Sequence, residues 1–303
     1  ISFQLLFMLI TIIVVSRGIQ KGIERASRFM MPALFVLFII LVIRALTLAG
    51  SGEGIQFILQ PDFSKVTSQT FLDAMGQSFF TLSVGVSVMV SYSSYLPKNQ
   101  SLPQAAVSIV GMNLMIVLLA GLAIFPAVFA YDLEPNAGPV LLFNVLPTVF
   151  SQLPFGMLFF IAFLVLFLFA ALTSAFSLLE IIVSVISGRK NEQRAKWSWI
   201  IGLAIFILGV PSALSFGILA DVQILGKSIF DLADYTVSNI LLPFGALLIS
   251  IFVSNKMKRS LLYSELNRGN FLKKGLFNAW YFTIRYVAPL FIILVMMDVL
   301  GIW

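Results

Sequence analysis

The chain has 303 residues, of which 60% are hydrophobic and 11% are charged, and its formal net charge is +6. Soluble domains carry about 25% charged residues, so this composition excludes a water-soluble globular domain and predicts an integral membrane protein. The sequence contains neither cysteine nor histidine, which removes thiol nucleophiles, the usual soft metal ligands and the commonest general base, so we expect no enzyme.

Eight apolar segments predict transmembrane helices, because a bilayer core of about 30 Å needs about 20 helical residues. Their long apolar runs differ from the alternating pattern of a membrane β-barrel. The predicted fold class is therefore all-α transmembrane. In chain order the segments cover residues 1–16, 29–49, 74–96, 104–130, 156–187, 197–214, 235–254 and 277–302.

Lysine and arginine are concentrated in every second connection between these segments. One set of connections holds fifteen of them, whereas the other set holds Lys65 and Lys227. The positive-inside rule then makes the first set cytoplasmic and places residue 1 outside a plasma or inner membrane. Because the sequence opens inside an apolar segment without a leader, we expect it to be truncated and to lack an odd number of preceding spans. The first set is Arg17, Lys21, Arg25, Arg28, Lys98, Arg189, Lys190, Arg194, Lys196, Lys256, Lys258, Arg259, Arg268, Lys273 and Lys274.

The segment 74–96 has a small, polar centre, Ser83-Val-Gly-Val-Ser87. Gly85 tolerates non-helical backbone, and serine hydroxyls compete for backbone partners. A broken helix at membrane depth survives only against protein or a water-filled cavity, and transporters bind ions and substrates at such breaks. The alternative interpretation is that these small residues let two helices pack closely.

Two further segments carry polar residues at membrane depth. Asn113 lies within 104–130, while Thr173, Ser174, Ser177 and Glu180 lie within 156–187. The hydroxyl groups could bond to carbonyl groups of their own helix, but a buried amide needs a partner. A set of oxygen ligands without carboxylates suits a weakly held monovalent cation, and sodium is the candidate.

Several of these stretches resemble the neurotransmitter:sodium symporter family. Gln77-Ser-Phe-Phe-Thr-Leu-Ser83, followed by Gly85 and Ser91-Tyr-Ser-Ser-Tyr95, is similar to the family's sixth span. The stretch 17–25 resembles the loop between the fourth and fifth spans, 120–127 resembles the end of the seventh, and 170–174 resembles part of the eighth. The resemblance covers nearly the whole chain in order, and it implies spans four to eleven of the family.

The resemblance implies an inverted-repeat fold of five plus five helices in a single transmembrane transporter domain, 1–303. Residues 1–49 would end the first repeat, 71–254 would form the second, and 277–303 would be an extra C-terminal helix. Bacterial members of the family transport amino acids with sodium, so we expect an amino-acid substrate, two sodium sites in the full-length protein and a lipid-embedded chain that binds no nucleic acid.

The resemblance also implies site residues. Thr81 and Asn113 match ligands of the first sodium site; Ala170 (through its carbonyl group), Thr173 and Ser174 match the second. The positions that match the substrate pocket are Phe80, which would be its aromatic lid, Ser83, Val86, Ser174 and Leu178.

The resemblance also implies two gating residues. Asp234 matches an outer-gate acid of the family, and Tyr95 matches an inner-gate residue. The family's inner-gate acid falls at Gly188 here, so that ion pair is absent or moved to Glu192. Val117 stands where chloride-dependent relatives have serine, while Gln77 and Thr81, which help to bind chloride in them, are retained, so the use of chloride stays open. The predicted function is sodium-coupled amino-acid symport by alternating access, with no uptake by the 303-residue fragment alone. The alternatives are a proton-coupled carrier that uses Glu180 and a non-transporting membrane scaffold.

Overall fold

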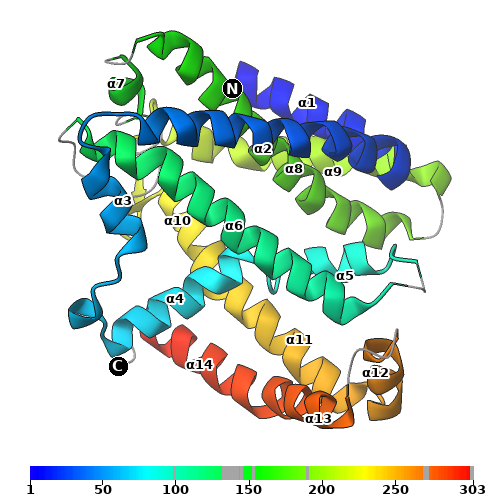
Figure 1. Cartoon of the computed structure of the whole chain (residues 1–303). Coiled ribbons are helices and arrows are strands. Elements are labelled where there is room, and N and C mark those ends of the chain that lie inside the picture. Colours follow the sequence, from blue (N-terminus) through cyan, green and yellow to red (C-terminus); the bar gives the residue numbers. More distant parts are fainter. Residues whose placement is uncertain are drawn as a thin grey trace. The chain divides into compact units, whose positions relative to one another are not determined.

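Helices and short connections make up nearly all of the chain in the computed structural model (Figure 1), which describes residues 1–97, 100–131, 143, 146–151, 154–188, 191–268 and 273–300. Within these residues, six helices are long and apolar enough to cross a membrane. The shorter helix α1 (Ser2–Ser16) and a broken helix account for the other two predicted spans. The prediction of an all-α transmembrane fold is confirmed.

The chain forms two compact units. The first comprises residues 1–12, 66–111 and 177–303, and the second comprises residues 13–65 and 112–176. Two long helices, α6 (Leu102–Phe129) and α8 (Gly156–Ser187), contribute to both.

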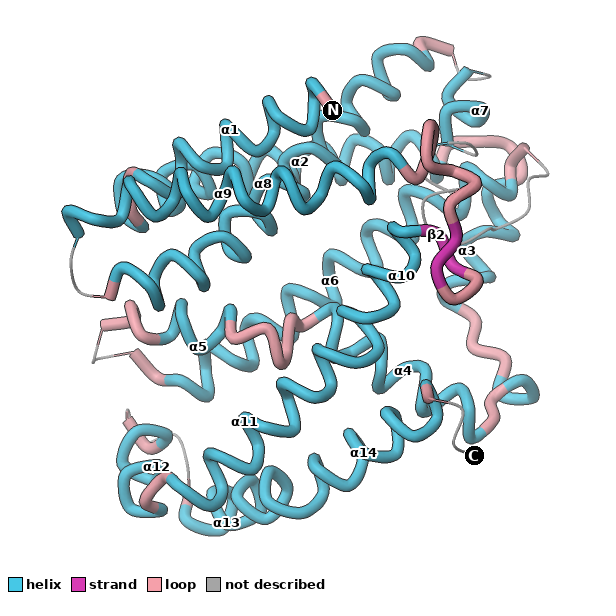
Figure 2. Tube along the Cα trace, turned by 180° about the vertical axis from the view of Figure 1, so that it is seen from behind, coloured by secondary structure: helices cyan, strands magenta, loops and turns pink. Residues whose placement is uncertain are grey.

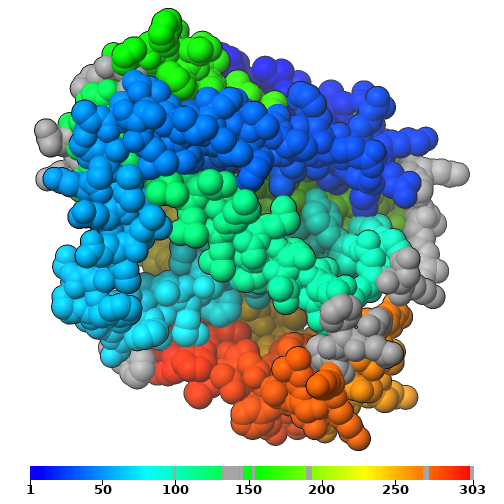
Figure 3. All heavy atoms as spheres, in the orientation of Figure 1, coloured from blue at the N-terminus to red at the C-terminus, as the bar shows by residue number. Residues whose placement is uncertain are grey.

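The second unit also contains α2 (Arg25–Leu46), α3 (Ser51–Leu59) and α7 (Leu146–Ser151). Side chains of α2, α6, α7 and α8 share one apolar core. Helix α3 packs against the end of α6, as Figure 3 shows, and a Cβ atom at Gly54 would come within 2.6 Å of the Phe125 carbonyl oxygen. Glycine at this position therefore lets the two backbones approach closely. The buried residues of the core are Leu34, Phe38, Leu41, Val128, Leu146, Phe150, Phe163 and Leu166.

The first unit holds the broken helix, α4 (Ser68–Thr81) and α5 (Val88–Ser93), together with α9 (Asn191–Leu214) and a hairpin of β1 (Gln223–Ile224) and β2 (Lys227–Ser228). The chain continues through α10 (Ile229–Tyr235), α11 (Leu242–Lys256), α12 (Arg259–Leu266), α13 (Lys274–Phe282) and α14 (Ala288–Val299).

Helices α11 and α14 lie side by side, and both contact α4 (Figures 1 and 2). Two polar contacts hold one end of α14. The Tyr235 hydroxyl donates to the Val299 carbonyl oxygen at 2.9 Å, and the Gln69 side-chain amide donates to the Asp298 carboxylate at 2.9 Å. These contacts fix the end of α14 to α10 and α4.

Three helical segments contain a π-helical turn, in which the helix widens by one residue per turn. These turns are Ile19–Glu24 before α2, Thr236–Leu241 between α10 and α11, and Thr283–Val287 between α13 and α14. The helical segment that contains α2 starts ten residues before the apolar stretch because helical hydrogen bonding does not depend on the hydrophobicity of the side chains. The predicted start of this helix at residue 29 is therefore wrong, because the helix begins at Ile19.

Candidate functional site

The predicted break in the helix is present at Ser83–Ser87. Helix α4 ends at Thr81 and α5 begins at Val88. Between them Ser83, Gly85 and Ser87 have positive φ angles of 52°, 96° and 67°. Glycine adopts this conformation freely, whereas each serine is strained by it, and such strain is common at binding sites.

The break lies where α4–α5 meets the backbone of α11. A Cβ atom at Gly85 would overlap the Leu242 carbonyl oxygen and lie 2.9 Å from the Ala246 nitrogen, and a Cβ atom at Gly245 would overlap the Gly85 carbonyl oxygen. Close packing of small residues and a broken helix, which the sequence leaves as alternatives, therefore occur together at one place.

Four of the five expected substrate-pocket residues lie in the first unit. Phe80 is in the last turn of α4, Ser83 and Val86 are in the break, and Leu178 is on α8. The side chains of Phe80 and Leu178 are 54% and 49% exposed, so both are free to contact a further group. The fifth residue, Ser174, lies in the second unit and is exposed.

The two residues expected for the first sodium site, Thr81 and Asn113, belong to different units. Thr81, in the first unit, is within 3.4 Å of the Gln77 side-chain amide, which donates to its hydroxyl group. Asn113, in the second unit, lies on α6 and is half-buried.

The residues expected for the second sodium site all lie on α8 in the second unit. The Thr173 hydroxyl donates to the Ala170 carbonyl oxygen at 2.9 Å, and Ser174 follows directly. Rotation of the hydroxyl proton would leave these two oxygens close enough to share one cation. The residues present are neutral oxygen donors, which fit a monovalent cation better than a divalent one.

Asp234, the expected outer-gate acid, is an exposed residue of α10, and its carboxylate accepts a hydrogen bond from the Ser238 hydroxyl at 3.2 Å. It lines a polar surface pocket of about 470 Å³ together with Lys227, Asp231 and Tyr235. The Lys227 ammonium group lies 4.7 Å from the centre of the Tyr235 ring. The pocket therefore presents charges of both signs.

Tyr95, the expected inner-gate residue, contacts a buried ion pair. Its hydroxyl group donates to Glu180 Oε1 at 3.2 Å, and Arg194 is ion-paired with the other oxygen of that carboxylate. Glu180 is fully buried and Arg194 is 8% exposed. One turn before Tyr95, the Tyr92 hydroxyl is 2.8 Å from the Ser177 hydroxyl. The end of α5 is thus attached to α8 and, through Glu180, to α9.

This ion pair is missing from the sequence-based prediction. The sequence-based prediction assigns Arg194 to a cytoplasmic loop. This assignment is wrong, because the structure places Arg194 in α9, where it is buried. Glu180 lies two turns before the end of α8 and Arg194 one turn after the start of α9, so a helical hairpin brings them together. The pairing of an intramembrane acid with a nearby base is the signal that could have found it. The Glu192 side chain and residues 98, 189 and 190 lie outside the described part of the chain.

The fold and the broken helix define the class of α-helical membrane transporters that bind their substrates at helix breaks. Residues 1–301 match the sodium:neurotransmitter symporter family, and the chain belongs to this family. Its relatives are transporters and not enzymes.

Three relatives illustrate the match. The chain is 56% identical over 302 residues to an uncharacterized sodium-dependent transporter of Bacillus subtilis. This match covers 100% of this chain and 67% of that protein. It is 41% identical to an uncharacterized sodium-dependent transporter of Haemophilus influenzae, over 97% of this chain and 64% of that one. The crystal structure of MhsT in complex with L-phenylalanine matches 97% of this chain and 66% of its own, with 40% identity and a TM-score of 0.86. The chain thus spans about two thirds of the length of these relatives.

Proposed function

We propose that the protein carrying this chain is a sodium-coupled amino-acid symporter that works by alternating access. The observation that carries the proposal is the broken helix at Ser83–Ser87, with three residues at positive φ in five positions. A break of this kind frees backbone carbonyl and amide groups in the middle of a span, where they can bind ions and the charged ends of an amino acid. The similarity to MhsT, whose crystal structure contains L-phenylalanine, supports an amino-acid substrate.

The substrate site would be formed by Phe80, Ser83, Val86, Ser174 and Leu178. The half-exposed rings and methyl groups of Phe80, Val86 and Leu178 suit an apolar side chain, because their burial against it is favourable. The serine hydroxyl groups and the free backbone groups of the break suit the polar ends of the substrate. An apolar or aromatic amino acid fits this set.

Two sodium sites would couple transport to the ion gradient. Thr81 and Asn113 would serve the first site, and Ala170, Thr173 and Ser174 the second. The affinity of these sites for sodium would differ between the outward-open and inward-open states. Such a difference in affinity is what an ion needs in order to shift a conformational equilibrium.

The gates would be Asp234 on one side of the membrane and Tyr95 on the other, with the arginine-rich connections in the cytoplasm. The contact of Tyr95 with the Glu180–Arg194 pair supports its role, because inward opening would have to release α5 from this attachment. The same contacts disfavour Glu180 as a mobile proton carrier, since both of its oxygens are engaged.

Uptake of radiolabelled L-phenylalanine into proteoliposomes that contain the full-length protein tests the proposal, with either a sodium gradient or a pH gradient imposed. We expect accumulation that depends on sodium. Accumulation driven by the pH gradient alone would support the proton-coupled alternative. Failure to bind any labelled amino acid would support the scaffold alternative, and either result would overturn the proposal.

A further inference from the structure

The π-helical turn Thr283–Val287, between α13 and α14, deprives one backbone carbonyl group of its usual partners. The Ala288 N–H donates to the carbonyl oxygen of Thr283, five residues back, rather than to that of Ile284. The residue that would donate to Ile284 in a π-helical pattern is Pro289, which has no N–H. The Ile284 carbonyl group thus needs another donor, because an unpaired carbonyl group in an apolar membrane-length helix is costly.

Ser250 of α11 supplies this donor. Its hydroxyl group donates to the Ile284 carbonyl oxygen, and the residue is buried, with 4% of its surface exposed. One turn further along α11, the Ser254 carbonyl oxygen accepts a hydrogen bond of 2.8 Å from the Tyr281 hydroxyl. Two hydrogen bonds within the first unit therefore join the second half of α11 to the helix that contains the π-helical turn.

The first half of α11 packs against the break. Gly85 lies against the Leu242 carbonyl oxygen and the Ala246 nitrogen, so closely that an added Cβ atom would overlap them. Leu242, Ala246, Ser250 and Ser254 recur at every fourth residue and are all buried, so they lie along one side of the helix. Helix α11 therefore connects the break to the π-helical turn.

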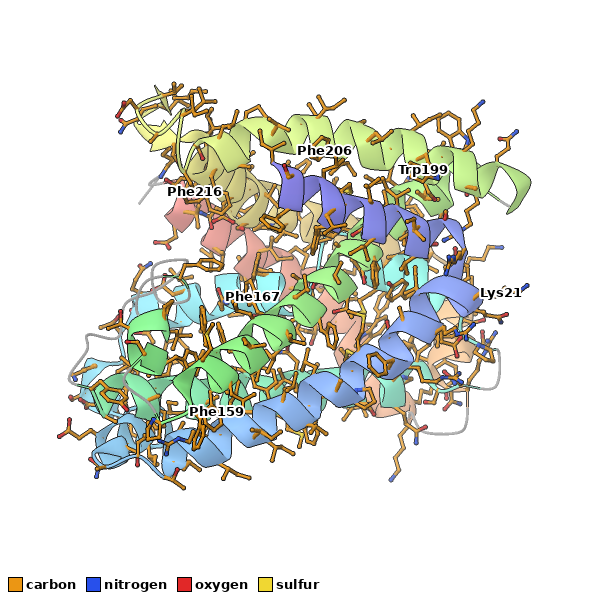
Figure 4. All side chains as sticks on the ribbon, turned by 90° about the horizontal axis from the view of Figure 1, so that it is seen from above. Lys21, Phe159, Phe167, Trp199, Phe206 and Phe216 are labelled. Atoms are coloured by element: carbon orange, nitrogen blue, oxygen red, sulfur yellow. The ribbon has the colours of Figure 1, made fainter. Side chains whose placement is uncertain are left out.

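Helix α14 makes a second connection between these two places. Its far end is bonded to Gln69 of α4, the helix that leads into the break, and to Tyr235 of α10. Helix α10 is held in turn at its start, where the Phe230 ring centre lies 4.9 Å from that of Phe216, which Figure 4 labels just beyond the end of α9. The pair α13–α14 thus bridges α4 and α11, the two helices that meet at the break.

We propose that Ser250 is a positioning residue for the substrate site. Its hydrogen bond to the Ile284 carbonyl group holds α13–α14 against α11 and so fixes the geometry of the break at Ser83–Ser87. The inference rests on the proposed function, because that function makes the break, with Ser83 and Val86, part of the substrate site. The alternative is that Ser250 only satisfies a buried carbonyl group.

Hydrogen exchange of the backbone amides of residues 82–88 tests the positioning without any ligand. It is measured by mass spectrometry on the full-length protein in nanodiscs, and we expect Ser250→Ala to raise the exchange rate about fivefold, as the loss of one hydrogen bond predicts. Ser250→Cys, whose thiol is a weaker donor, serves if Ser250→Ala does not fold.

Ser254→Ala is the matched control. Ser254 is a buried serine on the same side of α11, and its hydroxyl group donates to the Ile251 carbonyl oxygen of its own helix. We expect this variant to exchange at the wild-type rate in residues 82–88. An unchanged rate in Ser250→Ala, or an equal rise in both variants, would overturn the proposal.

Pro289→Ala separates positioning from the satisfaction of a buried carbonyl group. Alanine at this position gives the Ile284 carbonyl group an N–H donor from its own helix, so adding it to Ser250→Ala should restore the unfolding temperature. The faster exchange of the break should persist in the double variant, because α11 is still not bonded to the π-helical turn. Recovery of both quantities would show that Ser250 only satisfies the carbonyl group and would overturn the proposal.

Binding of labelled L-phenylalanine to the same preparations separates this inference from the proposed function. Ser250→Ala and the double variant should both bind about fivefold more weakly than wild type, and Ser254→Ala should bind as wild type does. Wild-type affinity in Ser250→Ala would overturn the positioning role. A wild-type protein that binds no labelled amino acid would overturn the proposed function, and the exchange of the break would then decide the role of Ser250 by itself.

Discussion

Gly85 and Gly245 pack backbone against backbone, so that a methyl group added to Gly245 would overlap the Gly85 carbonyl oxygen. The broken segment that holds Ser83 and Val86 is therefore positioned by α11. Because Gly85 also has a φ angle of 96°, its replacement would add backbone strain to the overlap.

We expect Gly245→Ala to displace the break and to destabilise the protein by about 1–3 kcal/mol, the usual effect of overpacking. Substrate binding should fall more than stability does, since the displaced residues include the proposed pocket. Unfolding temperature and the affinity for L-phenylalanine, measured on the same preparation, check this. The control is Gly275→Ala on α13, where an added Cβ atom meets nothing within 4 Å. Unchanged affinity in folded Gly245→Ala would contradict the positioning role.

The buried pair Glu180–Arg194 predicts strong coupling between two substitutions. Glu180→Gln or Arg194→Gln alone should each destabilise the protein by about 3–5 kcal/mol, because each leaves a buried charge without its partner. The double variant should recover part of that loss, and a double-mutant cycle of unfolding free energies measures the coupling. The exposed pair Glu24–Arg28 is the control and should show little coupling. Additive losses at the buried pair would contradict this prediction.

Composition and hydropathy were sufficient to predict the eight helical segments, six of them long enough to cross a membrane, and the break, because lipid exposure and backbone freedom depend on local sequence. The Glu180–Arg194 pair was missed because Arg194 belongs to a charged stretch that is typical of a loop. Helix α9 starts before its apolar stretch and includes Arg194, which is buried there. The π-helical turns were also missed, since a one-residue widening leaves the apolar pattern almost unchanged. The ligand residues Thr81, Asn113, Thr173 and Ser174 came from the family resemblance, since isolated hydroxyl groups in a membrane helix have a simpler explanation in bonds to their own helix.

The proposed inner gate predicts that Tyr95→Phe shifts the protein toward an inward-open state. The substitution removes the hydroxyl group that donates to Glu180 and leaves the ring in place. A single Ser83→Cys label site reports access from the cytoplasmic side, and the 303 residues contribute no other cysteine. We expect faster labelling of Ser83→Cys when Tyr95→Phe is also present, and no change with Tyr286→Phe, an exposed tyrosine outside the proposed gate. Equal labelling rates would show that this hydrogen bond does not hold the gate.

The second sodium site predicts a specific effect of Thr173→Val, which removes one oxygen and keeps the shape of the side chain. If the Thr173 hydroxyl and the Ala170 carbonyl group share a sodium ion, the sodium concentration for half-maximal uptake should rise at least about tenfold, the loss expected for one charged contact. Asn113→Ala should raise the sodium concentration for half-maximal uptake similarly, through the first site.

The matched control is Thr283→Val. The Thr283 hydroxyl donates to the Ala279 carbonyl oxygen at 3.0 Å, so it also bonds within its own helix, and it lies outside both sites. Since the loss of a helix-internal hydrogen bond affects both threonine variants alike, a sodium dependence that changes only in Thr173→Val separates ion binding from helix stability. Unchanged sodium dependence in Thr173→Val and Asn113→Ala would remove the assignment of both sites.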